Sequence, residues 1–259
     1  MNTRLCKENP CGFTRHGFLW EALHRQPSGQ HLDYGAYDGS VIRILVETGC
    51  AVSAVGVEVN RKIVEENEGL MPPKASLQLI ERNQPLPFNN SRFSSASLLD
   101  VIEHIADQQL VLNELYRVLQ PGGRLIVTVP GKHLFSFLDT GNFKFRFPRI
   151  HRALYLIRHT AEEYDLRYLD NPDGLIGDIE REKGWHQHFS RRELQELLEG
   201  CGFQVCVFDG SGFFTRLILP FRLVSPAFLR PLWNRLLALD ARLFARTNVF
   251  CLAEKPAEG

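Results

Sequence analysis

The sequence of 259 residues predicts a single α/β domain, built on a Rossmann-like, mostly parallel sheet of seven strands with helices on both faces. Three observations predict this fold. Short β-rich runs alternate with helically spaced stretches in the first half, a glycine turn joins the first strand to a helix, and the strand pattern returns near the C-terminus. The expected core comprises residues 30–130, 186–208 and 247–255, with insertions after the fifth strand (134–186) and between the sixth and seventh (211–246).

The expected elements follow in chain order. Runs typical of strands lie at 30–35, 52–58, 76–81, 95–100, 123–130, 203–208 and 248–254. Apolar residues at helical spacing predict helices over 39–49, 60–68 and 107–119. Pro121, Gly122 and Gly123 are expected to stop the third helix and lead into the fifth strand. Ser190 is expected to cap a further helix over 191–200.

Composition excludes several classes of protein. Thirty basic residues balance thirty acidic ones, so no global field favours a nucleic-acid partner. The six cysteines lack zinc-ligand spacing, and no metal site is expected; they are Cys6, Cys11, Cys50, Cys201, Cys206 and Cys251. The first residues lack the apolar stretch of a secretion signal, and no run of 18 apolar residues occurs, so a cytoplasmic location is expected.

A glycine turn and a later acid indicate a nucleotide-like cofactor. Gly35 and Gly39 flank the turn between the first strand and its helix, where backbone N–H groups are free to meet a ligand. Glu58 ends the second strand, where a carboxylate can accept hydrogen bonds from ribose hydroxyls. Tyr37 and Ser40 stand where a dinucleotide fingerprint requires glycine, which disfavours a nicotinamide cofactor.

Several motifs together resemble the class I S-adenosylmethionine-dependent methyltransferases, particularly the type 11 group that includes quinone-biosynthesis enzymes. The motifs are LDYGAYDG, VGVE, QPLPF, DVIEHI and ELYRVLQPGGRLIVTVP. The resemblance implies S-adenosylmethionine as cofactor. It implies contacts from Asp33, Gly35, Ala36 and Gly39 to the amino-acid end, from Glu58 to the ribose, from Glu81 and Arg82 beside the adenine, and from Asp100 and Val101 after the fourth strand.

Methyl transfer requires an acceptor held in line with the methyl group and, where the acceptor carries a proton, a base. The candidate bases are His104, after the fourth strand, and three histidines at the borders of the first insertion, His133, His186 and His188. The alternative is that these histidines only orient or pack against neighbouring helices. We expect residues 134–186 to cover the acceptor.

Three functions fit the sequence. The first is O-methylation, or less favourably N- or C-methylation, of a small, lipid-linked or sugar-linked acceptor. The second is RNA modification through the basic, aromatic stretch 143–152, against which the neutral net charge weighs. The third is a non-catalytic scaffold that binds the cofactor.

The second insertion suggests a partner surface. Residues 211–246 carry six arginines and the single acid Asp240 among many large apolar residues. Such a pattern suits a helix lying on a membrane surface, or helices packed on the sheet or on the second subunit of a homodimer. Pro220, Pro226 and Pro231 exclude a helix that spans the bilayer.

Overall fold

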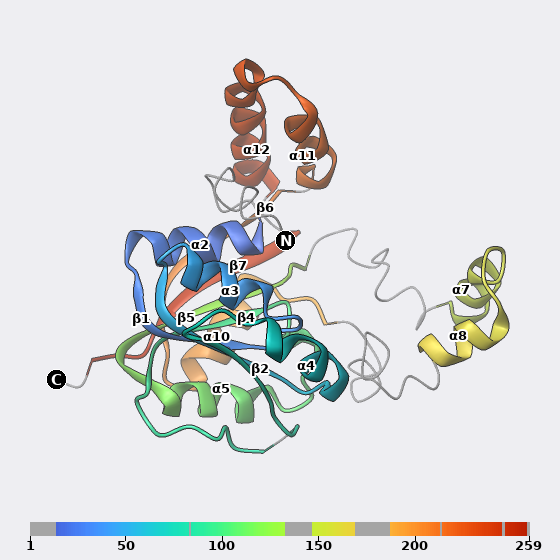
Figure 1. Cartoon of the computed structure of the whole chain (residues 1–259). Coiled ribbons are helices and arrows are strands. Elements are labelled where there is room, and N and C mark those ends of the chain that lie inside the picture. Colours follow the sequence, from blue (N-terminus) through green and yellow to red (C-terminus); the bar gives the residue numbers. More distant parts are fainter. Residues whose placement is uncertain are drawn as a thin grey trace.

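Seven strands form one mixed sheet at the centre of the molecule (Figure 1). The computed structural model describes residues 14–82, 84–132, 147–168, 187–212, 214–244 and 247–257. The strands are β1 (Ser28–Tyr34), β2 (Ala51–Glu58), β3 (Ala75–Leu79), β4 (Phe93–Leu99), β5 (Leu119–Pro130), β6 (Gln204–Ser211) and β7 (Asn248–Glu254). Their order is β3-β2-β1-β4-β5-β7-β6, and β7 alone runs antiparallel to both of its neighbours. The predicted mostly parallel, seven-stranded sheet is confirmed.

Helices cover both faces of this sheet (Figure 1). One face carries α2 (Arg15–Arg25), α3 (Ser40–Glu47) and α4 (Arg61–Asn67), and the other carries α5 (Gln108–Val118) and α10 (Arg191–Gly200). On the first face Leu19 and Leu45 pack with Ile126 of the sheet. On the second face Leu112 and Leu194 pack with the main core cluster. Burial of one apolar stripe per helix therefore holds the layers together.

Local signals fix where most helices begin. Ser190 caps α10 as predicted, in a capping box: the Glu193 N–H donates to Ser190 Oγ over 3.2 Å, and the Ser190 N–H donates to Glu193 Oε2 over 2.8 Å. Asn60 and Asp107 cap α4 and α5 with side-chain oxygens that accept from the N–H groups of Ile63 and Leu110. The sequence did not predict α2, whose N-cap Thr14 accepts a hydrogen bond from the Gly17 N–H.

The fifth strand begins earlier than predicted. Helix α5 ends at Val118 and β5 begins at Leu119, so the Pro121–Gly123 segment belongs to the irregular start of the strand and not to a separate turn. The Gly122 N–H donates to the Lys255 carbonyl over 2.8 Å, and the pairing with β4 shifts register there. A bulged strand start accommodates the glycines that suggested a turn.

Both insertions lie where they were predicted. The first contains α7 (Pro148–Tyr155) and α8 (Ala161–Tyr168), which meet through the rings of Tyr155 and Tyr164, 5.5 Å apart. The second contains α11 (Thr215–Val224), a short 3-10 turn (Ala227–Leu229) and α12 (Arg230–Phe244), and it stands away from the sheet in Figure 1. Within the described ranges, no helix is both long and apolar enough to cross a membrane.

Candidate functional site

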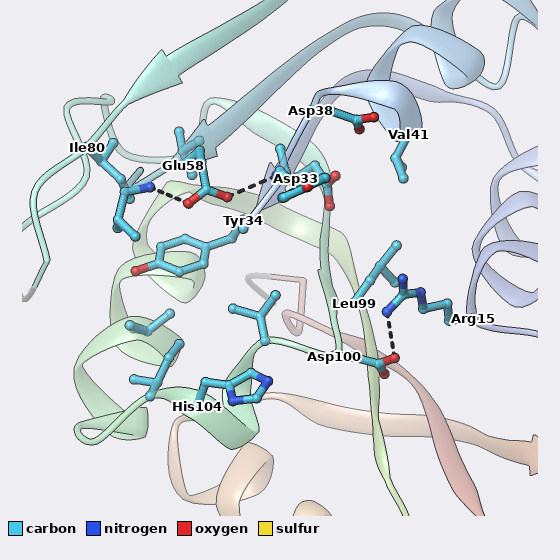
Figure 2. A pocket seen from close by; sticks show the side chains of 18 of the residues that line it. Arg15, Asp33, Tyr34, Asp38, Val41, Glu58, Ile80, Leu99, Asp100 and His104 are labelled. Carbon is cyan, nitrogen blue, oxygen red and sulfur yellow. Dashed lines mark hydrogen bonds and ion pairs between the residues drawn. The ribbon is translucent and has the colours of Figure 1, made fainter. Parts of the chain in front are cut away.

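A cavity of about 700 Å³ opens at the carboxyl edge of the parallel strands. Its walls come from the ends of β1, β2 and β4, from the loops that follow them, and from the start of α2 (Figure 2). The lining residues are Arg15, His16, Asp33, Tyr34, Gly35, Ala36, Tyr37, Asp38, Ser40, Val41, Val57, Glu58, Val59, Ile80, Arg82, Leu99, Asp100, Val101, His104, Ile105 and Val111. Ligands of open α/β sheets bind at this edge.

Glu58 is held rigidly at the end of β2. It is buried, and both carboxylate oxygens accept backbone hydrogen bonds: Oε2 from the Tyr37 N–H over 3.0 Å, and Oε1 from Val59 and Asn60 over 2.7 and 3.1 Å. Figure 2 shows the carboxylate facing the cavity. Oε1 already accepts two hydrogen bonds, whereas Oε2 accepts one and has a second lone-pair site, so the side chain can accept a further hydrogen bond from a diol at Oε2.

The turn after β1 is closed by a glycine in the left-handed region. Gly35 has a φ of +77°, and a Cβ atom placed there would lie 2.6 Å from Cγ2 of Val101. A side chain at position 35 is therefore excluded by Val101 on the opposite wall of the cavity and disfavoured by the left-handed backbone of the turn. Gly39, with a φ of +70°, caps α3 and lies outside the lining, beside Met71.

Asp33 is a buried carboxyl group in the wall of the cavity. The Ser97 hydroxyl donates to its Oδ1 atom over 2.5 Å. Burial raises the pKa of Asp33 from 3.8 to about 7, while the hydrogen bond from Ser97 and the charge of Arg15 oppose that rise. The group can therefore change its charge near neutral pH.

An ion pair between Arg15 of α2 and Asp100 after β4 forms part of the cavity wall. Arg15 Nη1 donates to Asp100 Oδ2 over 2.8 Å, and the Thr128 hydroxyl donates to Asp100 Oδ1 over 2.8 Å. Asp100 sits in the left-handed region with a φ of +55°. Beside the pair, burial and the charge of Arg15 lower the pKa of His16 to about 4, so this imidazole is neutral at pH 7.

Sequence reasoning missed Arg15 and His16 because it did not predict helix α2. The available signal was Thr14 as an N-cap, followed by apolar residues at 18, 19 and 23.

The structure brings together most of the predicted cofactor residues. Asp33, Gly35, Ala36, Glu58, Arg82, Asp100 and Val101 line the cavity, whereas Gly39 and Glu81 do not. Glu81 follows β3 with an exposed side chain, between the lining residues Ile80 and Arg82. Alternation of side chains after a strand explains this placement. A contact between Glu81 and the cofactor stays a prediction.

Of the two candidate bases that the structure describes, one lines the cavity and the other does not. His104 lines the cavity from the 3-10 turn η2 (Ile102–His104), with Nε2 4.0 Å from Glu103 Oε1. His188 precedes α10 and is not part of the lining. His133 and His186 lie outside the described residues.

The charge of the cavity favours a cationic ligand. Four carboxyl side chains (Asp33, Asp38, Glu58 and Asp100) line it against two arginines (Arg15 and Arg82). A site with this balance of charge attracts a positive group and repels a pyrophosphate. Among the described residues, no group of three metal-ligating side chains was found.

Residues 14–206 match the family model described as a methyltransferase domain. The chain belongs to this methyltransferase family. The predicted resemblance to class I, type 11 methyltransferases is thereby confirmed, and S-adenosylmethionine is the cofactor of the family. The sulfonium of that cofactor is the kind of cation that this cavity favours.

Curated relatives and solved structures agree with the methyltransferase assignment. A ubiquinone/menaquinone biosynthesis C-methyltransferase of Geotalea daltonii is 28% identical over 132 residues, which cover 46% of this chain and 56% of the relative. The enzyme of the same name from Desulfotalea psychrophila is 24% identical over 180 residues, 68% of this chain and 66% of the relative. The chain thus spans less than two thirds of these relatives.

Among solved structures, a putative sarcosine dimethylglycine methyltransferase from Galdieria sulphuraria superposes with a TM-score of 0.57 at 16% identity, covering 93% of this chain and 84% of that one. At this identity the likeness shows the methyltransferase fold alone.

Proposed function

We propose that this methyltransferase transfers the methyl group of S-adenosylmethionine to a hydrophobic acceptor. The observation that carries the choice of cofactor is the set of carboxyl groups at the ends of β1, β2 and β4 around one cavity. When bound, the cofactor supplies an electrophilic methyl group on a positively charged sulfur. The carboxyl groups of the cavity would stabilise that charge, and no glycine-rich pyrophosphate loop is needed.

The residues present fit the cofactor at both of its ends. Glu58, fixed by three backbone N–H groups, would accept a hydrogen bond from a ribose hydroxyl at Oε2. At the amino-acid end, Arg15 would pair with the carboxylate and Asp33 would accept from the ammonium group. Ile80 and Arg82 follow β3 beside Glu58 and would flank the base.

His104 is the base that we propose. It lines the cavity at the end of β4, where an acceptor beside the methyl group would lie. An imidazole can remove the proton of a hydroxyl group as the acceptor atom attacks. His188 stays a weaker proposal, because it lies outside the lining.

The acceptor that we propose is a ring-hydroxylated, quinone-type molecule. The proposal rests on the names of the two relatives described above, which are C-methyltransferases of ubiquinone and menaquinone biosynthesis. The sequence alone favoured O-methylation, and both reactions need a hydroxyl group to lose its proton. The neutral net charge of the chain weighs against RNA modification, and in the described part of the basic stretch Arg152 pairs with Asp165 over 3.4 Å.

The test measures cofactor binding and turnover separately. Calorimetry should show binding of S-adenosylmethionine and of its demethylated product, and none of NAD. Purified protein with methyl-labelled cofactor and demethylated quinols should then yield a labelled lipid, whose NMR spectrum separates a methyl group on carbon from one on oxygen. Binding of NAD alone would overturn the proposal. Cofactor binding without transfer to any quinol would favour the alternative of a non-catalytic scaffold that only binds the cofactor.

A further inference from the structure

Exposed apolar side chains gather on the hairpin formed by α11 and α12. Eight of the large apolar residues exposed in the described chain lie there: Phe214, Phe221, Leu223, Val224, Phe228, Leu232, Leu236 and Leu239. The most exposed are Val224, at 83%, and Phe228, at 78%, and both lie at the turn between the two helices. Figure 1 shows the hairpin standing clear of the sheet. Such a patch on a protruding element marks an interaction surface.

The hairpin is nevertheless well packed internally. The rings of Phe221 and Trp233 stack with centroids 5.9 Å apart, and the indole N–H of Trp233 donates to Ser225 Oγ over 2.8 Å. The buried Arg222 donates from Nε to Asn234 Oδ1 over 2.7 Å. The apolar tip is thus presented by an ordered pair of helices.

The base of the hairpin lies against the end of β6, because a Cβ atom on Gly212, which follows β6, would clash with the side chain of Asp240. Asp240 Oδ1 accepts the Phe214 N–H over 3.1 Å, and Leu237 is fully buried. Asp240 is also the only acid in the sequence between Gly212 and Asn248, and it is buried. The same stretch carries six arginines. Of these, Arg222 is buried, whereas Arg235 is exposed and Arg230 is partly exposed. The described surface of the hairpin therefore combines apolar side chains with the positive charge of Arg230 and Arg235, and the one acid of the stretch is buried.

The hairpin leaves the sheet at the same edge as the cavity. Ser211, the last residue of β6, and Pro130, the last residue of β5, both pair with Asn248. Strands β6 and β5 therefore point the same way, and the hairpin rises from the carboxyl edge, where Glu58 and Asp33 line the cavity. A surface bound by the hairpin would face this edge of the domain.

We propose that the tip of the α11–α12 hairpin inserts into an anionic lipid surface. Apolar side chains would enter the acyl boundary while arginines meet the headgroups, as in interfacial helices. A second copy of the chain fits less well, because a symmetric interface would bring the arginines of both copies together without acids to pair with them. The inference needs neither cofactor nor acceptor, so it stands apart from the proposed methyl transfer.

The test is co-sedimentation of the full chain with vesicles, without cofactor. Vesicles of phosphatidylcholine and phosphatidylglycerol at roughly two to one should bind the protein, and salt should release it. Pure phosphatidylcholine should bind it less. Phe228→Glu should weaken binding by about tenfold or more, because it places a charge where an exposed aromatic ring would enter the acyl boundary. The matched control is Val52→Glu, which changes an exposed apolar residue at the opposite edge of the sheet and should bind like the unmodified chain.

Three results would overturn the inference. They are an absence of binding to the mixed vesicles at low salt, equal binding by the Phe228→Glu variant, and equal losses in the Phe228→Glu and Val52→Glu variants. A concentration-dependent dimer that Phe228→Glu abolishes, without vesicle binding, would assign the tip to a second copy. Calorimetry with S-adenosylmethionine on the same variants reports separately on the proposed function, because Phe228 does not line the cavity.

Discussion

The Ser97 hydroxyl donates a hydrogen bond of 2.5 Å to Asp33, its register partner on the neighbouring strand. Asp33 and Ser97 are the last members of a buried row of hydrogen-bonded polar side chains. In this row His31 Nε2 lies 2.9 Å from Ser97 Oγ, and His31 Nδ1 lies 2.7 Å from Ser95 Oγ. Burial and the charge of Arg124 lower the pKa of His31 to about 3, so its ring is neutral. Because a hydroxyl has one proton to donate, Ser97 can donate to Asp33 only while His31 Nε2 carries the proton of the ring. The protonation of Asp33 is thereby linked to the tautomer of His31.

Asp33→Asn should change how stability depends on pH. The ordinary pKa of an aspartate is 3.8, and burial raises the pKa of Asp33 in the folded chain to about 7. The contribution of Asp33 to stability is therefore complete below about pH 4 and is lost as the pH rises through 7. This group alone lowers the free energy of unfolding by up to about 1.4 kcal/mol per pH unit in that window. The amide introduced by the substitution does not ionise, so the variant should lose less stability than the unmodified chain between about pH 5 and about pH 8.

Urea unfolding of both proteins at the two pH values measures this difference. An identical loss of stability in the variant and the unmodified chain would contradict it. Calorimetry should also show weaker binding of S-adenosylmethionine by the variant, because a neutral amide replaces a charged acceptor for the ammonium group.

Glu58→Gln should weaken binding of S-adenosylmethionine by about tenfold or more. Its amide NH2 group would have to face a backbone N–H group that now donates to the carboxylate, and the ribose would lose an acceptor. The matched comparison is Glu81→Gln, which tests the adenine-side contact implied by the resemblance. Because Glu81 lies outside the lining, calorimetry should show a smaller loss of affinity for this variant. A larger loss for Glu81→Gln than for Glu58→Gln would show that the adenine-side prediction from the sequence was the better one.

Gly35→Ala should destabilise the domain more than Gly49→Ala. Both glycines have a left-handed φ, of +77° and +73°, so both substitutions carry a backbone cost of about 1 kcal/mol. At Gly49 the new methyl group meets open space, whereas at Gly35 it meets Val101 at 2.6 Å. We expect a further loss of about 1–3 kcal/mol for Gly35→Ala, measured by thermal or urea unfolding. Equal losses at the two sites would mean that Val101 moves aside without cost.

His104→Gln should lower kcat by roughly 10²-fold or more while the affinity for S-adenosylmethionine changes little. His16→Gln alters the other histidine described in the lining and serves as the comparison. A base that must be deprotonated makes kcat fall toward low pH, so this acidic limb of the pH profile should disappear in the first variant only. If His16→Gln abolishes turnover and His104→Gln does not, the proton is removed from the α2 side of the cavity.

The strand ends and their acids could be predicted from the sequence because the necessary information is local. Glu58 follows a buried strand after Gly35 within one strand-helix-strand unit, and that spacing alone places both residues at the same edge of a parallel sheet. Ser190 and Glu193 specify the start of α10 within four residues.

Contacts between distant parts of the chain were decided only by the tertiary structure. Arg15 reaches Asp100 across 85 positions because α2 packs on the sheet, and no spacing rule encodes that pairing. The glycine at 35 was predicted for its turn, yet the side chain that excludes a Cβ atom there belongs to Val101, after β4. The sequence by itself determined the fold class and the acids at the strand ends, because local periodicity and spacing set them, and its motifs indicated the family by their resemblance. Which side chains close the cavity depended on how buried surfaces far apart in the chain pack against each other.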